Sequence, residues 1–416
     1  DSVHFCSPTA LKVSHLSPHN IDDLEKVDLC VVGGAGHVGL PLAIAFANTG
    51  LRTLVYDINE AALEQIGRGE LPALEYDADP LLKKTLANGN LVLSSDHKDV
   101  GKADMIIVTI GTPVDEYMNP VHRAVKQCMD DLRPYFRDDQ LLILRSTLYP
   151  GTSDWVKNYL MSNDCKMDVA FCPERVVQGY TIRELHGMPQ IVAGTDEASA
   201  ERAKELFARV APEIVGMKPM EAEFAKLFNN AYRYVQFAIT NQFYMIADSA
   251  GVDYYKILEG MTHNYPRASD VPGAGFAAGP CLLKDTMQLA AFANNQFHLG
   301  HSAMLVNEGL ALYVVDQLRS EYDLQNTTVG LIGMAFKAEV DDVRSSLSYK
   351  MKKALIVHAK GTLTTDPFVK NDPDLLPLDD VIAQSDVLVL CTPHKAYKGL
   401  DLQGKPVIDV WNFFNK

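Results

Sequence analysis

The chain lacks the cysteine pairs that mark a metal site or a disulfide scaffold. It has seven cysteines, and no two of them form a CxxC pair. Such an odd, scattered set is typical of a reducing compartment, because small secreted domains carry dense, paired cysteines. We therefore expect a cytoplasmic protein without a structural metal.

The chain also lacks long apolar runs and an excess of basic residues. No run approaches the roughly 18 apolar residues of a membrane-spanning helix, and the first residues lack the basic-then-apolar pattern of a secretory signal. There are 38 Lys and Arg against 53 Asp and Glu, which gives a net charge of −15 at pH 7. This charge argues against nucleic acid or an anionic membrane as the partner. A phosphate ligand held by backbone amides and a few local cations remains compatible with it.

Internal repeats and low-complexity tracts are absent too, yet 416 residues are too many for one ordinary core. Residues 1–26 are polar and aperiodic, and we interpret them as an extension. Short apolar strands alternate with helical stretches over residues 27–212 and again over 319–416, whereas residues 213–318 show helical spacing of Ala, Phe, Leu and Met. This organisation predicts an α/β protein with two Rossmann-like, doubly wound parallel-sheet domains joined by a core of long helices.

A glycine-rich turn follows the first strand. In "GGAGHVG", the residues Gly34, Gly36 and Gly39 match GxGxxG, with His37 and Val38 between the last two. Glycines at this spacing permit the tight turn, the approach of a pyrophosphate and close helix–sheet packing.

Two further residues favour a dinucleotide. The second strand ends in Asp57, where a carboxylate accepts hydrogen bonds from a ribose and repels a 2′-phosphate, so the sequence predicts NAD rather than NADP. A surface acid that merely closes a strand is the alternative. Thr112 ends a later strand and is expected on the same cofactor side.

A lone cysteine raises a separate question. In "GFAAGPCLLKD", Cys281 follows small residues and precedes Lys284 and Asp285. It is either a small buried hydrophobe or a nucleophile. Lys226 and Asn230 lie four residues apart and therefore on one helix face, although Lys226 could be an ordinary solvated lysine.

Polar residues gather after three other predicted strands. Ser146 and Thr147 follow "LLILR", Glu174 and Arg175 stand in "CPERVVQG", and "GMAFKAEVDDVRSS" carries a charged cluster. For each segment the alternative is a purely structural role, in which the polar residues end a strand or form a solvated loop. The charged cluster comprises Lys337, Asp341, Asp342 and Arg344.

Taken together, the chain from about Val27 to its end resembles the UDP-glucose/GDP-mannose dehydrogenase family. The motifs "GHVGLPLA", "STLYPGT", "PERVVQG", "AEFAKLFNNA", "GAGFAAGPCLLKD" and "GLIGMAFKAEVDDVRSS" occur in the family order. The resemblance implies an NAD domain, a helical dimerisation core, a nucleotide-sugar domain and a homodimer or higher homo-oligomer. It also implies oxidation of a sugar CH2OH to a carboxylate, for polysaccharide or glycoconjugate precursors.

The same resemblance implies residue roles. Cys281 resembles the nucleophile, Lys226 the cation that steadies oxyanions, and Asn230 a substrate and oxyanion contact. Asp285 and Thr147 resemble the pair that orients the hydrolytic water, and Glu174 an acid–base group. The implied cofactor contacts are Gly34, Gly36, His37, Val38, Gly39, Asp57, Thr112, Thr147 and Arg344. The implied substrate contacts are Glu174, Arg175, Lys226, Asn230, Arg267, Gly275 and Lys337.

Departures from the family pattern bear on the sugar. UDP-glucose members usually read "GFGGSCFPKD" and "PEFLAEG", whereas this chain reads "GFAAGPCLLKD" and "PERVVQG", so Gln178 replaces a glutamate. Arg175 and Arg267 resemble the UDP-N-acetylhexosamine branch (UDP-GlcNAc or UDP-ManNAc), which makes UDP-glucose the second choice and GDP-mannose the third.

Two rival functions share part of this residue pattern. A two-electron dehydrogenase of the 6-phosphogluconate or hydroxyacyl type also uses a helix lysine and asparagine, but Cys281 with Asp285 argues against it. An inactive binding protein for NAD or a nucleotide sugar is disfavoured because the implied catalytic residues are all present.

Overall fold

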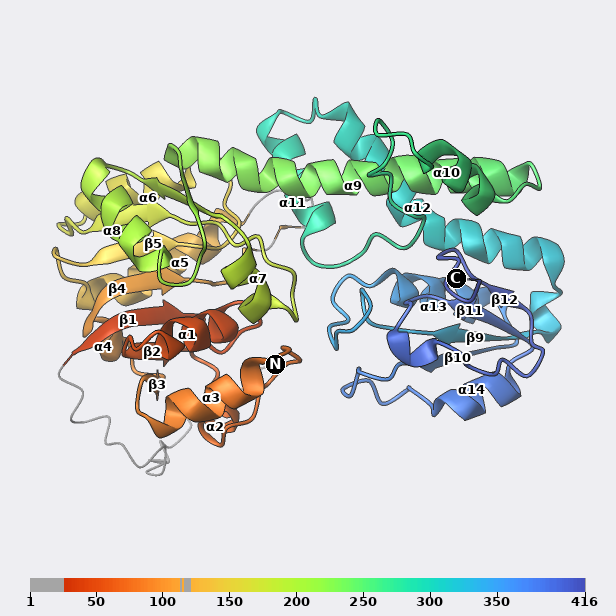
Figure 1. Cartoon of the computed structure of the whole chain (residues 1–416), viewed down its shortest axis with the longest axis horizontal. Coiled ribbons are helices and arrows are strands. Elements are labelled where there is room, and N and C mark those ends of the chain that lie inside the picture. The colour runs from red at the N-terminus through yellow and green to blue at the C-terminus, as the bar shows by residue number, and fades with distance from the viewer. Residues whose placement is uncertain (1–25, 113, 116–120, 416) are drawn as a thin grey trace, which may run out of the picture.

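The computed structural model describes residues 26–112, 114, 115 and 121–415. Most of the predicted extension therefore lies outside the described residues. The chain forms two α/β units and a helical region, and the long helix α9 runs along one side of both units (Figure 1).

The first unit is built on an eight-stranded sheet in the order β3-β2-β1-β4-β5-β6-β7-β8. All neighbours are parallel except β6 and β7, which are antiparallel. The strand order reverses at β1 and β4, where open α/β sheets bind ligands. The strands are β1 (Val27–Val32), β2 (Thr53–Tyr56), β3 (Leu91–Ser94), β4 (Ala103–Val108), β5 (Leu141–Leu144), β6 (Asp168–Phe171), β7 (Gln190–Gly194) and β8 (Ile214–Gly216).

Helices cover this sheet on both faces, and two apolar clusters bury the alternate sides of its strands. The fully buried Leu29 and Val31 point to one cluster, and Cys30 and Val32 to the other, which is the two-sided burial of a doubly wound sheet. The helices are α1 (Gly39–Asn48), α2 (Glu60–Gly67), α3 (Ala78–Ala87), α4 (His97–Val100), α5 (His122–Leu132), η2 (Arg133–Tyr135), α6 (Thr152–Met161), α7 (Thr181–Gly187) and α8 (Glu197–Phe207).

The helical region contains the long helices that the spacing predicted. They are α9 (Pro219–Ser249), α10 (Tyr254–Thr262), α11 (Leu282–Phe292) and α12 (His298–Glu321). The side chain of Asn241 on α9 is fully buried and holds the backbone of Gly275 through both its amide atoms, at 3.0 and 2.9 Å. It thereby fixes the segment that leads to Cys281 against α9.

The second unit has a four-stranded parallel sheet in the order β10-β9-β11-β12. Its elements are η3 (Leu324–Asn326), β9 (Thr328–Ile332), α13 (Leu347–His358), β10 (Gly361–Thr365), α14 (Leu378–Gln384), β11 (Val387–Leu390), η4 (Lys395–Tyr397) and β12 (Val407–Ile408). The predicted fold class is confirmed. The domain boundaries at residues 212 and 318 stay predictions, and β8 and the end of α12 lie just beyond them.

Candidate active site

The glycine loop between β1 and α1 is packed too tightly for side chains. A Cβ on Gly34 would lie 2.6 Å from the carbonyl oxygen of Val31, and one on Gly39 would lie 2.4 Å from that of Gly33. Gly36 is less confined, with its nearest contact at 3.3 Å. The loop therefore lets α1 start close to the sheet and leaves backbone exposed beside a small cavity. That cavity is lined by residues of the loop, residues 71–75 and Gln178.

Asp57 stands at the end of β2 beside this loop. Its carboxylate accepts hydrogen bonds from the N–H groups of Ala35 and Asn59, both at 3.0 Å, and remains partly exposed. The next residue, Ile58, is 78% exposed and offers an apolar surface that the sequence argument overlooked. Bare loop backbone, a partly open carboxylate and an apolar neighbour fit an adenine nucleotide.

Two residues of α9 face the interior beside the end of β5. Lys226 and Asn230 are buried, and Glu223, one turn earlier, accepts hydrogen bonds from the N–H groups of Gly151 and Ser153 at 2.6 and 2.8 Å. Glu223 therefore fixes the start of α9 against the turn that follows Thr147. Sequence reasoning missed Glu223 because its partners lie about 70 residues away.

Asp285, in the first turn of α11, joins several of the predicted catalytic residues. Its side chain is fully buried. Oδ2 accepts a hydrogen bond from Asn230 at 2.5 Å and a long one from Thr147 Oγ1 at 3.5 Å. Lys284 Nζ lies 2.8 Å from Oδ1 as an ion pair and also reaches Thr112 Oγ1 at 3.4 Å. The structure thus brings α9, α11 and the ends of two strands together around one carboxylate.

Cys281 is the residue before α11, one turn from Asp285. Its side chain is solvent-accessible, yet enough protein surrounds it that partial desolvation, followed by the charge of Asp285, raises its pKa. Lys226, Lys284 and Arg344 act in the opposite direction, in that order of size. Lys226 therefore favours the thiolate, but the net shift of the Cys281 pKa is upward.

The small residues before Cys281 make room for the second α/β unit. Gly279 has φ +103°, and a Cβ on it would lie 2.5 Å from the ring of Phe336. A Cβ on Gly275 would overlap Trp411 at 2.1 Å. These glycines therefore allow the cysteine segment and the second unit to approach closely.

Glu174 follows β6, and both of its carboxylate oxygens have partners within the protein. Oε1 accepts the N–H groups of Arg175 and Val176 at 2.7 and 2.9 Å, and Oε2 lies 2.5 Å from a guanidinium nitrogen of Arg145. Arg145 is buried at 1% exposure, so this ion pair holds the loop that begins at Glu174. The acid–base role of Glu174 stays a prediction.

The charged cluster of the second unit contacts the loop after Glu174. Lys337 Nζ donates to the carbonyl oxygen of Gln178 at 2.7 Å, and burial lowers the pKa of Lys337 to about 8. Gln178 Nε2 lies 3.1 Å from Asp342 Oδ2 and 3.2 Å from His37 Nδ1. Burial lowers the pKa of His37 although Asp342 opposes that shift. Gln178 therefore connects the glycine loop with the second unit.

Arg344 is held by Asp342 through two guanidinium nitrogens, at 3.0 and 2.6 Å. Its positive charge also acts, more weakly than that of Lys226 or Lys284, to lower the pKa of Cys281. The guanidinium of Arg267 lies 5.2 Å from the ring of Tyr265, in an exposed loop. Within one chain the structure does not connect Arg267 with the other predicted site residues.

The described residues contain neither a metal-binding cluster nor a membrane-spanning helix. No group of three or more His, Cys, Asp and Glu side chains in that part of the chain is arranged to hold a metal ion. No helix among those residues is both long and apolar enough to cross a membrane.

Comparisons with known proteins agree with this architecture. Three models of the UDP-glucose/GDP-mannose dehydrogenase family match: the NAD binding domain at residues 27–211, the central domain at 220–309 and the UDP binding domain at 330–416. A UDP-N-acetyl-D-mannosamine dehydrogenase from Methanocaldococcus jannaschii is 29% identical over 411 residues, covering 93% of each chain. An NDP-N-acetyl-D-galactosaminuronic acid dehydrogenase from Ralstonia nicotianae is 27% identical, covering 93% of this chain and 96% of the relative.

A solved structure is similar throughout. The UDP-D-ManNAc dehydrogenase from Pyrococcus horikoshii superimposes with a TM-score of 0.86 at 26% identity, covering 93% of this chain and 96% of the other. The predicted cofactor, NAD, and the predicted oxidoreductase activity are confirmed at the level of the family. Because the three matching models together span most of its length, the chain belongs to the UDP-glucose/GDP-mannose dehydrogenase family of NAD-dependent oxidoreductases.

Proposed function

We propose that the chain oxidises the C6 hydroxymethyl group of a UDP-N-acetylhexosamine to a carboxylate. The reaction consumes the alcohol, one water and two NAD+, and yields the carboxylate, two NADH and three protons. The similar proteins from Methanocaldococcus jannaschii and Ralstonia nicotianae, which are named for N-acetylated sugars, support this class of substrate, as does Arg175. UDP-glucose is the second candidate and GDP-mannose the third.

The observation that carries the proposal is the position of Cys281 one turn from the buried carboxylate of Asp285 and under the influence of Lys226. After the first oxidation, the sulfur adds to the aldehyde carbon and forms a thiohemiacetal. The second oxidation converts this adduct to a thioester, and water releases the acid and restores the thiol. A two-electron dehydrogenase has no use for this cysteine.

The neighbouring side chains have separate tasks in this scheme. Lys226 stabilises the oxyanion that develops on the substrate carbon, and Asn230 places an amide beside Asp285. Asp285 and Thr147 orient the hydrolytic water in this scheme, and Thr147 Oγ1 lies 3.5 Å from Asp285 Oδ2. Glu174 serves as an acid–base group in this proposal, and its ion pair with Arg145 holds its loop.

NAD, when bound, accepts a hydride in each oxidation. The N–H groups of His37 and Val38 at the start of α1 would hold its pyrophosphate, and Asp57 would accept hydrogen bonds from its ribose. Thr112 lies beyond the end of β4, where its hydroxyl donates to the carbonyl oxygen of Thr147. From the second unit, Lys337 contacts the nucleotide sugar, and Arg344 would contact NAD.

A substrate panel tests the proposal. Purified protein is mixed with NAD and, in turn, UDP-GlcNAc, UDP-ManNAc, UDP-glucose, UDP-galactose and GDP-mannose, and NADH is followed at 340 nm. We expect the highest kcat/KM with one of the two N-acetylated sugars. Tenfold better use of UDP-glucose than of both would reverse the order of substrates, and no NADH with any sugar would support an inactive binding protein.

We also propose a homodimer that forms through α9. Six of its large apolar side chains are at least 42% exposed, and five of these recur on one helix face. A stripe of this kind is typical of a buried interface. The five residues are Phe228, Tyr232, Ile239, Phe243 and Ile246.

Light scattering tests this assembly. We expect a dimer for the wild type at micromolar concentration and a monomer when Ile246, 59% exposed, is changed to Glu. A monomeric wild type would remove the proposal. The proposed compartment is the cytoplasm, because the six cysteines in the described part of the chain are all free.

A further inference from the structure

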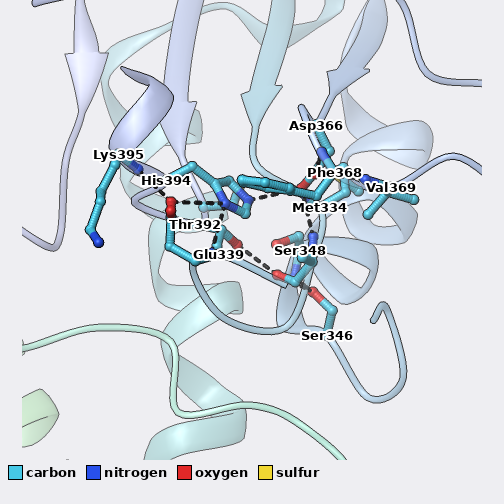
Figure 2. Close-up of polar contacts among 12 residues, drawn as sticks. Met334, Glu339, Ser346, Ser348, Asp366, Phe368, Val369, Thr392, His394 and Lys395 are labelled. Carbon is cyan, nitrogen blue, oxygen red and sulfur yellow. Dashed lines mark hydrogen bonds and ion pairs between the residues drawn. The ribbon is translucent and has the colours of Figure 1, made fainter. Parts of the chain in front are cut away.

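The second unit has an acidic residue at the same place as Asp57, and it is used differently. Asp366 follows β10, the strand beside β9, as Asp57 follows β2 beside β1. Its carboxylate is fully buried. It accepts backbone N–H groups at both oxygens, from Met334, Ala335, Phe368 and Val369, at 2.7 to 3.0 Å (Figure 2). Because its side chain is fully buried, whereas that of Asp57 is partly exposed, Asp366 organises the loop after β9 instead of meeting a ribose.

A buried histidine completes this arrangement. His394 Nε2 lies 3.1 Å from Asp366 Oδ2, and His394 Nδ1 lies 3.1 Å from the backbone nitrogen of Glu339 (Figure 2). Because Nδ1 must accept the hydrogen of that N–H, the ring proton belongs on Nε2, which donates it to Asp366. Burial alone would raise the pKa of Asp366, but the hydrogen bonds from His394 and the backbone outweigh it and lower that pKa.

The loop held in this way carries Lys337. It runs from Gly333, at φ +92°, to Glu339, at φ +62°. Thr392 Oγ1 donates to the carbonyl oxygen of Ala335 at 2.6 Å near its start. His394 accepts the N–H of Glu339 at its end, where a non-glycine residue has a left-handed backbone that costs energy unless its surroundings hold it.

We propose that His394 is a positioning residue for nucleotide-sugar binding. By accepting the N–H of Glu339 and donating to Asp366, it fixes the end of the loop and thereby the position of the Lys337 ammonium group. This inference rests on the proposed function in so far as Lys337 contacts the nucleotide sugar. His394 itself is fully buried, so it acts through the loop and not through contact with a ligand.

Two near-isosteric variants separate the two hydrogen bonds. In His394→Asn the amide oxygen replaces Nδ1 and can still accept the N–H of Glu339. In His394→Gln the amide nitrogen replaces Nε2 and can donate to Asp366, but the acceptor for Glu339 is lost. The measured quantities are the Kd for UDP by calorimetry, KM for the nucleotide sugar and for NAD, kcat, and Tm.

We expect His394→Gln to raise the Kd for UDP and the KM for the nucleotide sugar by about tenfold, the effect of one lost hydrogen bond. Its kcat and its KM for NAD should stay within about twofold of the wild type. His394→Asn should keep nearly wild-type UDP affinity, even if its Tm falls as far as that of His394→Gln. Equal losses of UDP affinity in the two variants, or a lower Tm with unchanged UDP affinity in both, would overturn the inference.

A double-mutant cycle with Lys337→Met tests the route. If His394 acts through Lys337, His394→Gln should change the Kd for UDP little when Lys337 is already replaced by Met. A double variant whose Kd rises by the product of the two single effects would contradict this. If His394→Gln does not fold, His394→Ala with added imidazole replaces it, and imidazole should restore UDP affinity. An inactive wild type would contradict the proposed function, whereas the UDP titrations would still decide the role of His394.

Discussion

Cys281 shows how opposing charges act on a single thiol. Partial desolvation and Asp285 raise its pKa, and three cations lower it, with Lys226 first. The resting sulfur is therefore mainly protonated at neutral pH, and the thiol must lose its proton as it adds to the aldehyde. In the proposed scheme, Asp285 both raises the pKa of the Cys281 thiol and orients the hydrolytic water. Replacing its carboxylate should therefore separate these two effects.

Asp285→Asn should lower the pKa of Cys281, because a negative neighbour is lost while Lys226, Lys284 and Arg344 remain. The check is the rate of iodoacetamide alkylation at Cys281 against pH, followed by mass spectrometry. Cys172 and Cys128 serve as internal references, because burial raises the pKa of each to about 12. An alkylation midpoint that stays in place or moves upward would refute this account of the thiol.

The lowered pKa of Lys337 predicts that UDP affinity depends on pH. Burial lowers its pKa to about 8, so the ammonium form dominates below pH 8 and is lost above it. UDP affinity should therefore fall between pH 7.5 and 9.5, approaching about tenfold per pH unit above the pKa. Calorimetry measures this affinity directly. Lys337→Arg keeps its charge over the range and should give a flat profile; a wild-type profile that is also flat would exclude Lys337 as the titrating contact.

At the scale of elements, the strand-end residues were predictable and their connections were not. Asp57, Thr112 and Thr147 follow parallel strands, and the carboxyl ends of such strands meet at one edge of a sheet. The short strands β3, β7 and β8 are hard to predict, because three to five residues carry little periodicity and β7 reverses direction.

The contacts of Glu223, Arg145 and His394 could not be predicted for a related reason. Each side chain is buried against a segment between 28 and about 70 residues away, and no local pattern specifies such a partner. The sequence does contain one clue, which is Gln178 in place of the glutamate of UDP-glucose members. In the structure, the amide group of Gln178 donates a hydrogen bond to the carboxylate of Asp342.

Gln178→Glu should weaken the connection between the glycine loop and the second unit. A carboxylate would replace an N–H group 3.1 Å from Asp342 Oδ2, so attraction becomes repulsion. We expect KM for both NAD and the nucleotide sugar to rise by about tenfold or more, from steady-state kinetics. Gln178→Met keeps the length without the charge and should do less harm. A glutamate variant that performs as well as the wild type, or better than the methionine variant, would show that this contact is unimportant.

At the scale of the whole molecule, the site exists only where three parts meet. The first unit supplies the cofactor loop and Thr147, the helical region supplies Lys226 and Cys281, and the second unit supplies Lys337 and Arg344. Gly279 lets the cysteine segment lie under Phe336, and the bond between Lys337 and Gln178 spans the two units. A four-electron oxidation requires this enclosure, because the aldehyde must stay beside the sulfur between the two oxidations.

The most direct test of the account is a single-turnover comparison of the wild type with Cys281→Ala, which measures NADH and sugar acid together. The wild type should form two NADH per acid with little free aldehyde. The alanine variant should bind NAD and UDP almost normally, since the sulfur makes few contacts in the ground state, yet acid formation should fall by several orders of magnitude. Acid formation by Cys281→Ala at close to the wild-type rate would contradict the account and leave Cys281 with a structural role.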